Sequence, residues 1–158
     1  MIEYSQIKLE EGYDEIVSLC GTWWKDSLFY KLYGIDYKVD KEVFLSLEKS
    51  GILILLVGRE EGKMIACYAG IKHPYVFNPT VVTASEIVWC LDKEHRTFRN
   101  LMGLFSAIDD VMKKNNVVLY FLAVSQEGKY EALEKILERK GLDRMDAVYS
   151  KLLNGGLT

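Results

Sequence analysis

The chain has 158 residues, of which 49% are hydrophobic and 27% are charged, and its net charge is −3. This length suits one domain over residues 1–158, and the composition is that of a folded chain rather than a disordered one. The negative net charge argues against nucleic-acid binding, which normally leaves a basic excess. The longest apolar run, residues 52–57, is too short to span a bilayer, and the acidic N-terminus lacks the features of a signal peptide. We therefore expect a cytoplasmic protein without a membrane partner.

The first third of the chain predicts one strand and two helices. Residues 2–8 have the pattern of a short strand, and apolar residues at helical spacing predict a helix over residues 14–27. A second helix is expected between an N-cap at Asp40 and a stop at Gly51. Residues 28–39 are rich in aromatics and have no clear period. Such a stretch could lie over a pocket, although we favour a packed connection.

Three strands are expected in the middle of the chain. Residues 52–58 form an all-apolar run, which is typical of a strand covered on both faces. A hairpin turn at residues 59–63 leads to a second strand over residues 64–73. The two prolines of the chain predict a loop over residues 74–80. The third strand covers residues 83–91. Strict alternation along it would place Ser85, Ile87, Trp89 and Leu91 on one side and Ala84, Glu86, Val88 and Cys90 on the other.

The last third predicts two helices and two strands. The first helix carries an apolar stripe formed by Leu101, Leu104, Phe105, Ile108, Val111 and Met112. A buried strand is expected over residues 117–124, a helix over residues 129–141 that ends at Gly141, and a closing strand over residues 146–153. This order of elements predicts an α/β protein with a mixed sheet and helices on both faces.

The three cysteines, Cys20, Cys67 and Cys90, are an odd number without metal-type spacing. Each has apolar neighbours in the sequence, which predicts three buried small hydrophobic side chains. The two histidines, His73 and His95, have no recognisable triad context, and a zinc site would need more ligands than the chain groups together. We expect no metal site.

Two segments carry a family resemblance. The sequences HPYVFNPTVVTASEIVWCLDKEHR (73–96) and LEKILERKGLDRMDAVYSKLL (133–153) resemble the GNAT superfamily of acetyl-CoA-dependent N-acetyltransferases, in particular its phage-encoded branch. The likeness covers nearly the whole chain and implies the GNAT-like fold, a mixed central sheet with helices on both faces. HRTFRNLM (95–102) resembles, more weakly, small internal virion proteins of podoviruses that look like degenerate GNAT proteins.

The resemblance places a cofactor loop at EHRTFRNLMGLF, residues 94–105. In GNAT enzymes an [RQ]-x-x-G-x-[GA] motif begins the long helix, and its N–H groups hold the pyrophosphate of coenzyme A. Arg96 takes the first position of that motif, Arg99 and Leu101 take the glycine positions, and the N–H groups of Asn100 and Leu101 would face the phosphates. Both glycines, which permit close approach, are missing, although the Arg99 guanidinium suits phosphate. The loop could bind coenzyme A, could have lost it, or could bind another anionic partner.

Glu86 lies in the strand that carries the general base in many GNAT enzymes. Its neighbours Ala84, Val88 and Cys90 are apolar, and desolvation would raise the pKa of the carboxyl group into the range useful for proton abstraction. Alternatively, Glu86 faces solvent or pairs with a lysine such as Lys72.

The resemblance also implies that the main chain of Trp89, Cys90 and Leu91 contacts pantetheine and polarises the thioester carbonyl. The tyrosine that serves the family as general acid falls on Leu137, which cannot donate a proton. Tyr130 could take this role or could simply pack.

These features lead to one hypothesis and one alternative. The protein would transfer acetyl from acetyl-CoA to a primary amine on a small molecule or a protein. Alternatively, it is a catalytically inactive GNAT-fold phage protein that binds a host protein or serves within a virion. The aromatic residues near the N-terminus would line the acceptor site, pack in the core, or contact a second subunit of a homo-oligomer; they are Trp23, Trp24, Phe29, Tyr30, Tyr33 and Tyr37.

Overall fold

The computed structural model describes residues 1–124 and 130–145. Within them, five strands form one mixed sheet in the order β1-β2-β3-β4-β5. The strands are β1 (Glu3–Gln6), β2 (Leu53–Glu60), β3 (Lys63–Tyr75), β4 (Asn78–Leu91) and β5 (Leu119–Phe121). Neighbouring strands are antiparallel except for β4 and β5, which run parallel. The predicted mixed sheet is confirmed.

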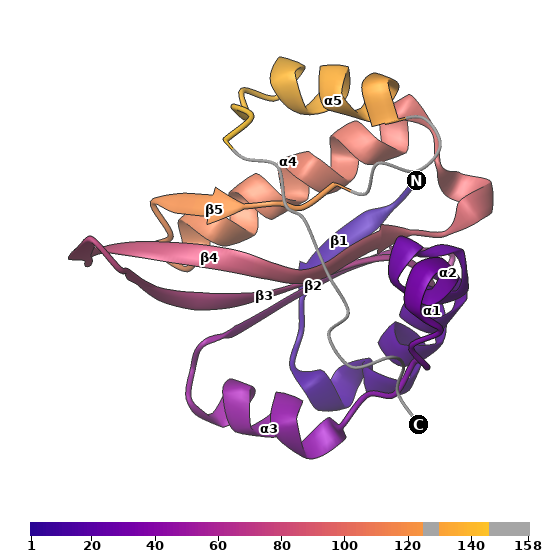
Figure 1. Cartoon of the computed structure of the whole chain (residues 1–158), viewed down its shortest axis with the longest axis horizontal. Helices are drawn as coiled ribbons and strands as arrows, with labels where there is room; N and C mark the ends of the chain where they lie inside the picture. Colours follow the sequence, from indigo (N-terminus) through magenta and orange to yellow (C-terminus); the bar gives the residue numbers. More distant parts are fainter. Residues whose placement is uncertain (125–129, 146–158) are drawn as a thin grey trace.

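Helices cover both faces of this sheet (Figure 1). One face carries α1 (Tyr13–Asp26), α2 (Leu28–Tyr33) and α3 (Lys41–Lys49), and the other carries α4 (Phe98–Lys114) and α5 (Tyr130–Arg139). Two short 3-10 turns, η1 (Leu9–Glu11) and η2 (Lys93–His95), precede α1 and α4. None of the described helices is long and apolar enough to cross a membrane.

Each layer of helices has its own core. On the α4 side, the helix inserts Leu104, Phe105 and Ile108 between the sheet and α5, and all three side chains are fully buried. On the α1 side, Cys20 of α1 packs against Val57 of β2 and buried residues of β3 and β4. The sheet is therefore buried on both faces, which explains the continuous apolar sequence of β2.

The predicted helices are present with the expected end signals. The Asp40 side chain accepts a hydrogen bond from the Glu42 N–H, which caps α3 as expected. Gly51 and Gly141 follow α3 and α5 with φ of +71° and +78°, the left-handed conformation that glycine adopts without strain. The apolar stripe of α4 is confirmed, since its members are buried against the sheet or packed on its edge.

The connection over residues 28–39 differs from the prediction. It begins with α2, which Ser27 caps by accepting a hydrogen bond from the Tyr30 N–H, and which ends at Gly34 with φ of +63°. The remainder both packs and borders a pocket. Tyr37 contacts the core around Cys20 and the Trp24 ring, and the segment lines a pocket of about 350 Å³. The pocket is lined by Trp24, Ile35, Asp36, Tyr37, Lys38, Val39, Asp40, Val43 and Phe44. The caps at Ser27 and Gly34 thus define helix α2 although the segment has no apolar period.

The predicted proline loop is also wrong. Both Pro74 and Pro79 lie in strands, because β3 and β4 extend into a long hairpin whose turn is only Val76 and Phe77. The register between the strands shifts after Pro74, and Pro79 has no partner across the ladder. A proline that donates no hydrogen bond is tolerated at such an irregular position.

Strand β5 is shorter than predicted. Of residues 117–124 only Leu119–Phe121 form a strand, and Leu119 is 43% exposed. Three residue pairs join β5 to β4, so few neighbours cover the segment. The predicted closing strand over residues 146–153 lies outside the described residues.

Two phenylalanines of α4 allow a matched test of this packing. Phe105 is 0% exposed in the core and Phe98 is 52% exposed at the start of the helix. Phe105→Ala is expected to lower the free energy of unfolding by about 3–5 kcal/mol, because it leaves a cavity. Phe98→Ala should change it by less than about 0.5 kcal/mol. Urea unfolding measures both values, and equal losses would contradict the packing of α4.

Candidate functional site

An irregularity in β4 determines which of its side chains share a face. Ala69 of β3 pairs with Val88, and the next residue, Gly70, pairs with Glu86, so Ile87 is an extra residue in the ladder. Such a bulge reverses the alternation of side chains beyond it. The strict alternation predicted from the sequence is therefore wrong.

The bulge distributes β4 between the two cores. Ala84, before the bulge, and Trp89 and Leu91, after it, all pack in the core on the α4 side. Cys90 packs on the α1 side. Because Glu86 lies two residues after Ala84 on the same side of the bulge, its side chain also extends from the α4 face.

Strands β4 and β5 pair only up to Ser85 and Phe121. Glu86 is thus the first β4 residue beyond the paired segment, and the chain after β5 leads away from β4 (Figure 1). Side-chain contacts span the separation. The Trp89 indole N–H donates a hydrogen bond of 2.9 Å to the Ala123 carbonyl oxygen, and the Ala123 N–H donates one to the Glu86 carboxyl group. From Glu86 to Leu91, the main chain of β4 has no strand partner on this side within the described part of the chain.

The Glu86 carboxyl group is desolvated at this point. Its Oε2 atom is buried and has no hydrogen-bond partner among the described residues. Burial raises the pKa of Glu86 to about 8, although a hydrogen bond from the Ala123 N–H acts in the opposite direction. Glu86 as a residue is half-buried, with its Oε2 atom turned away from solvent, so of the two alternatives left open by the sequence the structure agrees with a desolvated carboxyl group. Such a group can take a proton near neutral pH.

Tyr68 of β3 is a site residue that the sequence did not reveal. Its hydroxyl group is also buried without a partner among the described residues. A methyl group at position 70 would collide with that hydroxyl, so the ring extends along β3 over Gly70, whose partner in β4 is Glu86. Burial, and then the charge of Glu86, raise the pKa of Tyr68 far above its ordinary value. A glycine two residues after a strand tyrosine was the available signal.

The segment between β4 and α4 brings two arginines to the end of the sheet. The Arg96 Nε–H donates a hydrogen bond of 2.9 Å to the Leu91 carbonyl oxygen, which ties the guanidinium group to the end of β4. Arg99 lies in the first turn of α4, and both arginines are exposed. The first turn of α4 contains no acidic residue, so the positive end of the helix dipole is not offset there.

The first N–H groups of α4 divide into two pairs. Thr97 caps the helix: its hydroxyl oxygen accepts from the Asn100 N–H at 3.2 Å, and its carbonyl oxygen accepts from the Leu101 N–H at 3.0 Å. The N–H groups of Phe98 and Arg99 have no intrahelical acceptor, because they precede the first complete turn. An anion at this helix end would therefore meet Phe98 and Arg99 before Asn100 and Leu101.

The other sequence-predicted residues occupy different positions. The Leu101 side chain packs against the core rather than across the loop. Trp89 and Leu91 lie on the α4 face together with Glu86, whereas the Cys90 side chain lies on the opposite face. Leu137 packs in the same core as Leu101. The side chain of Tyr130 lies outside the described part of the structure.

Comparison with known proteins finds similar solved structures but no similar sequence family. No protein-family model and no curated protein matches the chain. An aminoglycoside acetyltransferase from an uncultured soil metagenomic sample aligns with 98% of this chain and 99% of its own, at a TM-score of 0.74 and 13% identity. Glucosamine-6-phosphate N-acetyltransferase from Arabidopsis thaliana aligns with 98% of this chain and 99% of its own, at a TM-score of 0.68 and 16% identity. A predicted acetyltransferase from Clostridium acetobutylicum, solved with acetyl-CoA, aligns with 96% of each chain, at 0.66 and 17% identity.

Identities this low establish the fold alone. The protein has the α/β fold of GNAT acyltransferases, as the sequence resemblance implied.

The buried Glu86 carboxyl group makes stability depend on pH. Below its ordinary pKa of 4.5 the group is protonated in both the folded and the unfolded chain. Between pH 4.5 and about 8 it is ionised only when the chain unfolds, so stability falls as pH rises through this window. This fall in the free energy of unfolding amounts to several kcal/mol at most, and we expect Glu86→Gln to abolish it.

Urea unfolding at several pH values, with the exposed Glu131→Gln as control, measures this effect. A wild-type and a Glu86→Gln profile that run parallel from pH 4.5 to 8 would contradict the desolvation of Glu86.

Proposed function

We propose that the protein is an N-acetyltransferase that transfers acetyl from acetyl-CoA to a primary amine. One observation carries the proposal: a desolvated carboxyl group, whose Oε2 atom is buried without a hydrogen-bond partner among the described residues, lies where β4 and β5 cease to pair. An unsatisfied buried acid is costly to the fold and is typical of sites where a proton is moved.

The residues around Glu86 fit coenzyme A. The main chain of β4 up to Leu91, with no strand partner beside it in the described structure, offers hydrogen-bonding groups to the amides of pantetheine. The N–H groups of Phe98 and Arg99, the helix dipole and the guanidinium groups of Arg96 and Arg99 suit the pyrophosphate. Acetyl-CoA supplies an acetyl group that its thioester activates toward a nucleophile.

The missing loop glycines do not obstruct this fit. Leu101 at one glycine position turns its side chain into the core, so it leaves the helix end open. Arg99 at the other position is exposed and adds a positive charge where glycine would add only space. Charge-assisted contacts from arginine then replace part of the close backbone approach.

Glu86 removes the proton that the acceptor nitrogen must lose. An amine attacks only through its free lone pair, and most amines are protonated near neutral pH. A carboxylate whose conjugate acid has a pKa of about 8 is a stronger base than an ordinary glutamate and accepts that proton directly or through water. The Tyr68 hydroxyl group, held in its protonated form by burial, is a hydrogen-bond donor beside this base.

The acceptor is a primary amine of a small molecule or a protein. The solved structures of the same fold include enzymes described as aminoglycoside and ribosomal-protein-alanine acetyltransferases, so the fold supports both kinds of acceptor. The alternative is a catalytically inactive GNAT-fold protein of phage origin that binds a host or virion protein. This inactive alternative is favoured by the hydrogen bonds of the Asn100 and Leu101 N–H groups to Thr97, because N–H groups bonded inside the protein are not free for a phosphate.

Calorimetry with acetyl-CoA separates the two functions. We expect binding in the micromolar range, and a loss of about tenfold or more in affinity when Arg96→Ala and Arg99→Ala are combined. Arg139→Ala is the control, because Arg139 is exposed on α5, away from this helix end. No heat at millimolar acetyl-CoA would overturn the acetyltransferase and favour the inactive binding protein.

Turnover should depend on ionised Glu86. With an amine acceptor identified by screening, kcat/KM is expected to rise with pH and level off above about 8, because the base must first lose its own proton. Glu86→Gln should lower the plateau by about 10²-fold or more, with acetyl-CoA affinity unchanged. A mutant with wild-type turnover would eliminate Glu86 as the base.

A further inference from the structure

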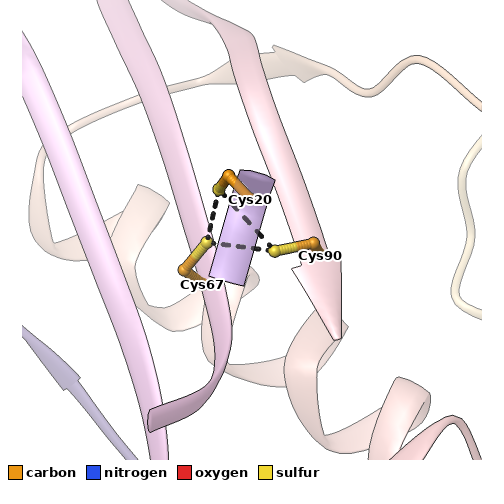
Figure 2. A group of neighbouring side chains, drawn as sticks. All are labelled: Cys20, Cys67 and Cys90. Carbon is orange, nitrogen blue, oxygen red and sulfur yellow. Dashed lines mark hydrogen bonds between the residues drawn. The ribbon is translucent and has the colours of Figure 1, made fainter. Parts of the chain in front are cut away.

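The three cysteines of the chain meet at one point in the fold. Cys20 from α1, Cys67 from β3 and Cys90 from β4 point toward one another (Figure 2). Their sulfur atoms lie 3.3 Å apart between Cys67 and Cys90, 3.5 Å between Cys20 and Cys67, and 3.8 Å between Cys20 and Cys90. The predicted burial is confirmed, since each residue is at most 4% exposed, but their convergence was not visible in the sequence spacing.

The backbone explains this convergence. Cys67 and Cys90 are direct partners across β3 and β4, so their side chains leave the sheet from the same face. The bulge at Ile87 turns Cys90 to the α1 side, and α1 places Cys20 against both. Rigid elements therefore hold all three sulfurs, which is the condition for a preorganised binding site.

Three thiols make up the donor set. Apolar and aromatic side chains, among them Val57, Met64 and Tyr37, pack around them, and no histidine or carboxylate of the described residues joins the group. The only grouping of metal-ligating side chains that the described residues form is these three thiols. A ligand set made of sulfur alone selects thiophilic ions over ions that prefer oxygen or nitrogen.

The distances leave room for one ion. A point equidistant from the three sulfurs lies about 2.0 Å from each, slightly closer than a metal–thiolate bond of about 2.3 Å. An outward shift of a few tenths of an ångström, or an ion slightly out of the plane of the sulfurs, makes up the difference. An iron–sulfur cluster, which is larger and takes four ligands, does not fit. Structural zinc needs a fourth ligand, which the described residues do not bring to this buried point.

The donor set favours Cu(I). Thiolates select Cu(I), zinc or iron–sulfur clusters, and the number of sulfurs and their distances argue against the last two. The thiol protons leave as the ion binds.

We propose that Cys20, Cys67 and Cys90 bind a single Cu(I) ion in three-coordinate thiolate coordination. The ion joins α1 to the central strands β3 and β4, on the face of the sheet opposite Glu86. The site is separate from the proposed acetyl-transfer chemistry and does not depend on it.

The reduced full-length protein, incubated anaerobically with Cu(I) supplied as its acetonitrile complex, tests this site. We expect one equivalent to remain bound against a Cu(I) chelator, X-ray absorption with three sulfur neighbours, and a higher melting temperature than the copper-free protein. Cys20→Ser, Cys67→Ser and Cys90→Ser should each weaken retention by about 100-fold or more. Met64→Leu, which keeps all three thiols in the same core, should retain one equivalent.

Four results would overturn the proposal. Three concern copper: loss of Cu(I) from the wild-type protein to the chelator, equal retention by Cys67→Ser and wild type, or a coordination shell with fewer than three sulfurs. The fourth is tighter binding of Zn(II) than of Cu(I). The X-ray absorption measurement uses wild-type protein alone, so the test holds even where a serine variant fails to fold.

Discussion

The bulge at Ile87 in β4 is the constraint on which both sites of this protein depend. One extra residue reverses which face of the sheet the later side chains of the strand occupy. Before it, the Glu86 side chain extends to the α4 face; after it, Cys90 turns to the α1 face while Trp89 joins the core next to α4. Without the bulge, Glu86 and Cys90 would share a face, as simple alternation predicts. A single backbone irregularity thereby places the Glu86 carboxyl group and the cluster of thiols on opposite faces of the sheet.

The second constraint is the short pairing between β4 and β5. A parallel neighbour along the whole of β4 would satisfy its main chain and leave no place for a ligand beside Glu86. Pairing instead ends at Ser85, and the Trp89 indole reaches across to Ala123 further along. The carboxyl group of Glu86 is left desolvated at that point, which costs stability and makes the group a better base. Loss of stability at a site that performs chemistry is common in folded proteins.

Much of the framework was predictable because it follows from local patterns. The apolar period of α4 and the Asp40 cap of α3 depend on neighbours in the sequence, and both were confirmed. Helix α2 was missed because its signals, a serine cap and a glycine stop, stand at the ends of a segment with no apolar period. The prolines of β3 and β4 led to the wrong prediction of a loop, because the hairpin is irregular where they lie.

The candidate site was predictable only in part. The sequence singled out Glu86 because an acid in an apolar strand is conspicuous, and the arginines because they stand where the family resemblance places a cofactor loop. Tyr68 and the meeting of the three thiols depend on pairing between strands and on the bulge, which no spacing along the chain records. The sequence pointed to the N–H groups of Asn100 and Leu101 for anion binding, whereas the structure leaves those of Phe98 and Arg99 without an intrahelical acceptor. The position of the Thr97 cap decides which N–H groups are free.

The central claim is that the fold holds Glu86 as a desolvated base, and its ionisation can be observed directly. Carbon-13 NMR of the side-chain carboxyl group, assigned by its absence in Glu86→Gln, gives the pKa of this residue in the intact protein. The account predicts a titration midpoint near pH 8. A midpoint near the ordinary value of 4.5 would show a solvated carboxylate and contradict the account.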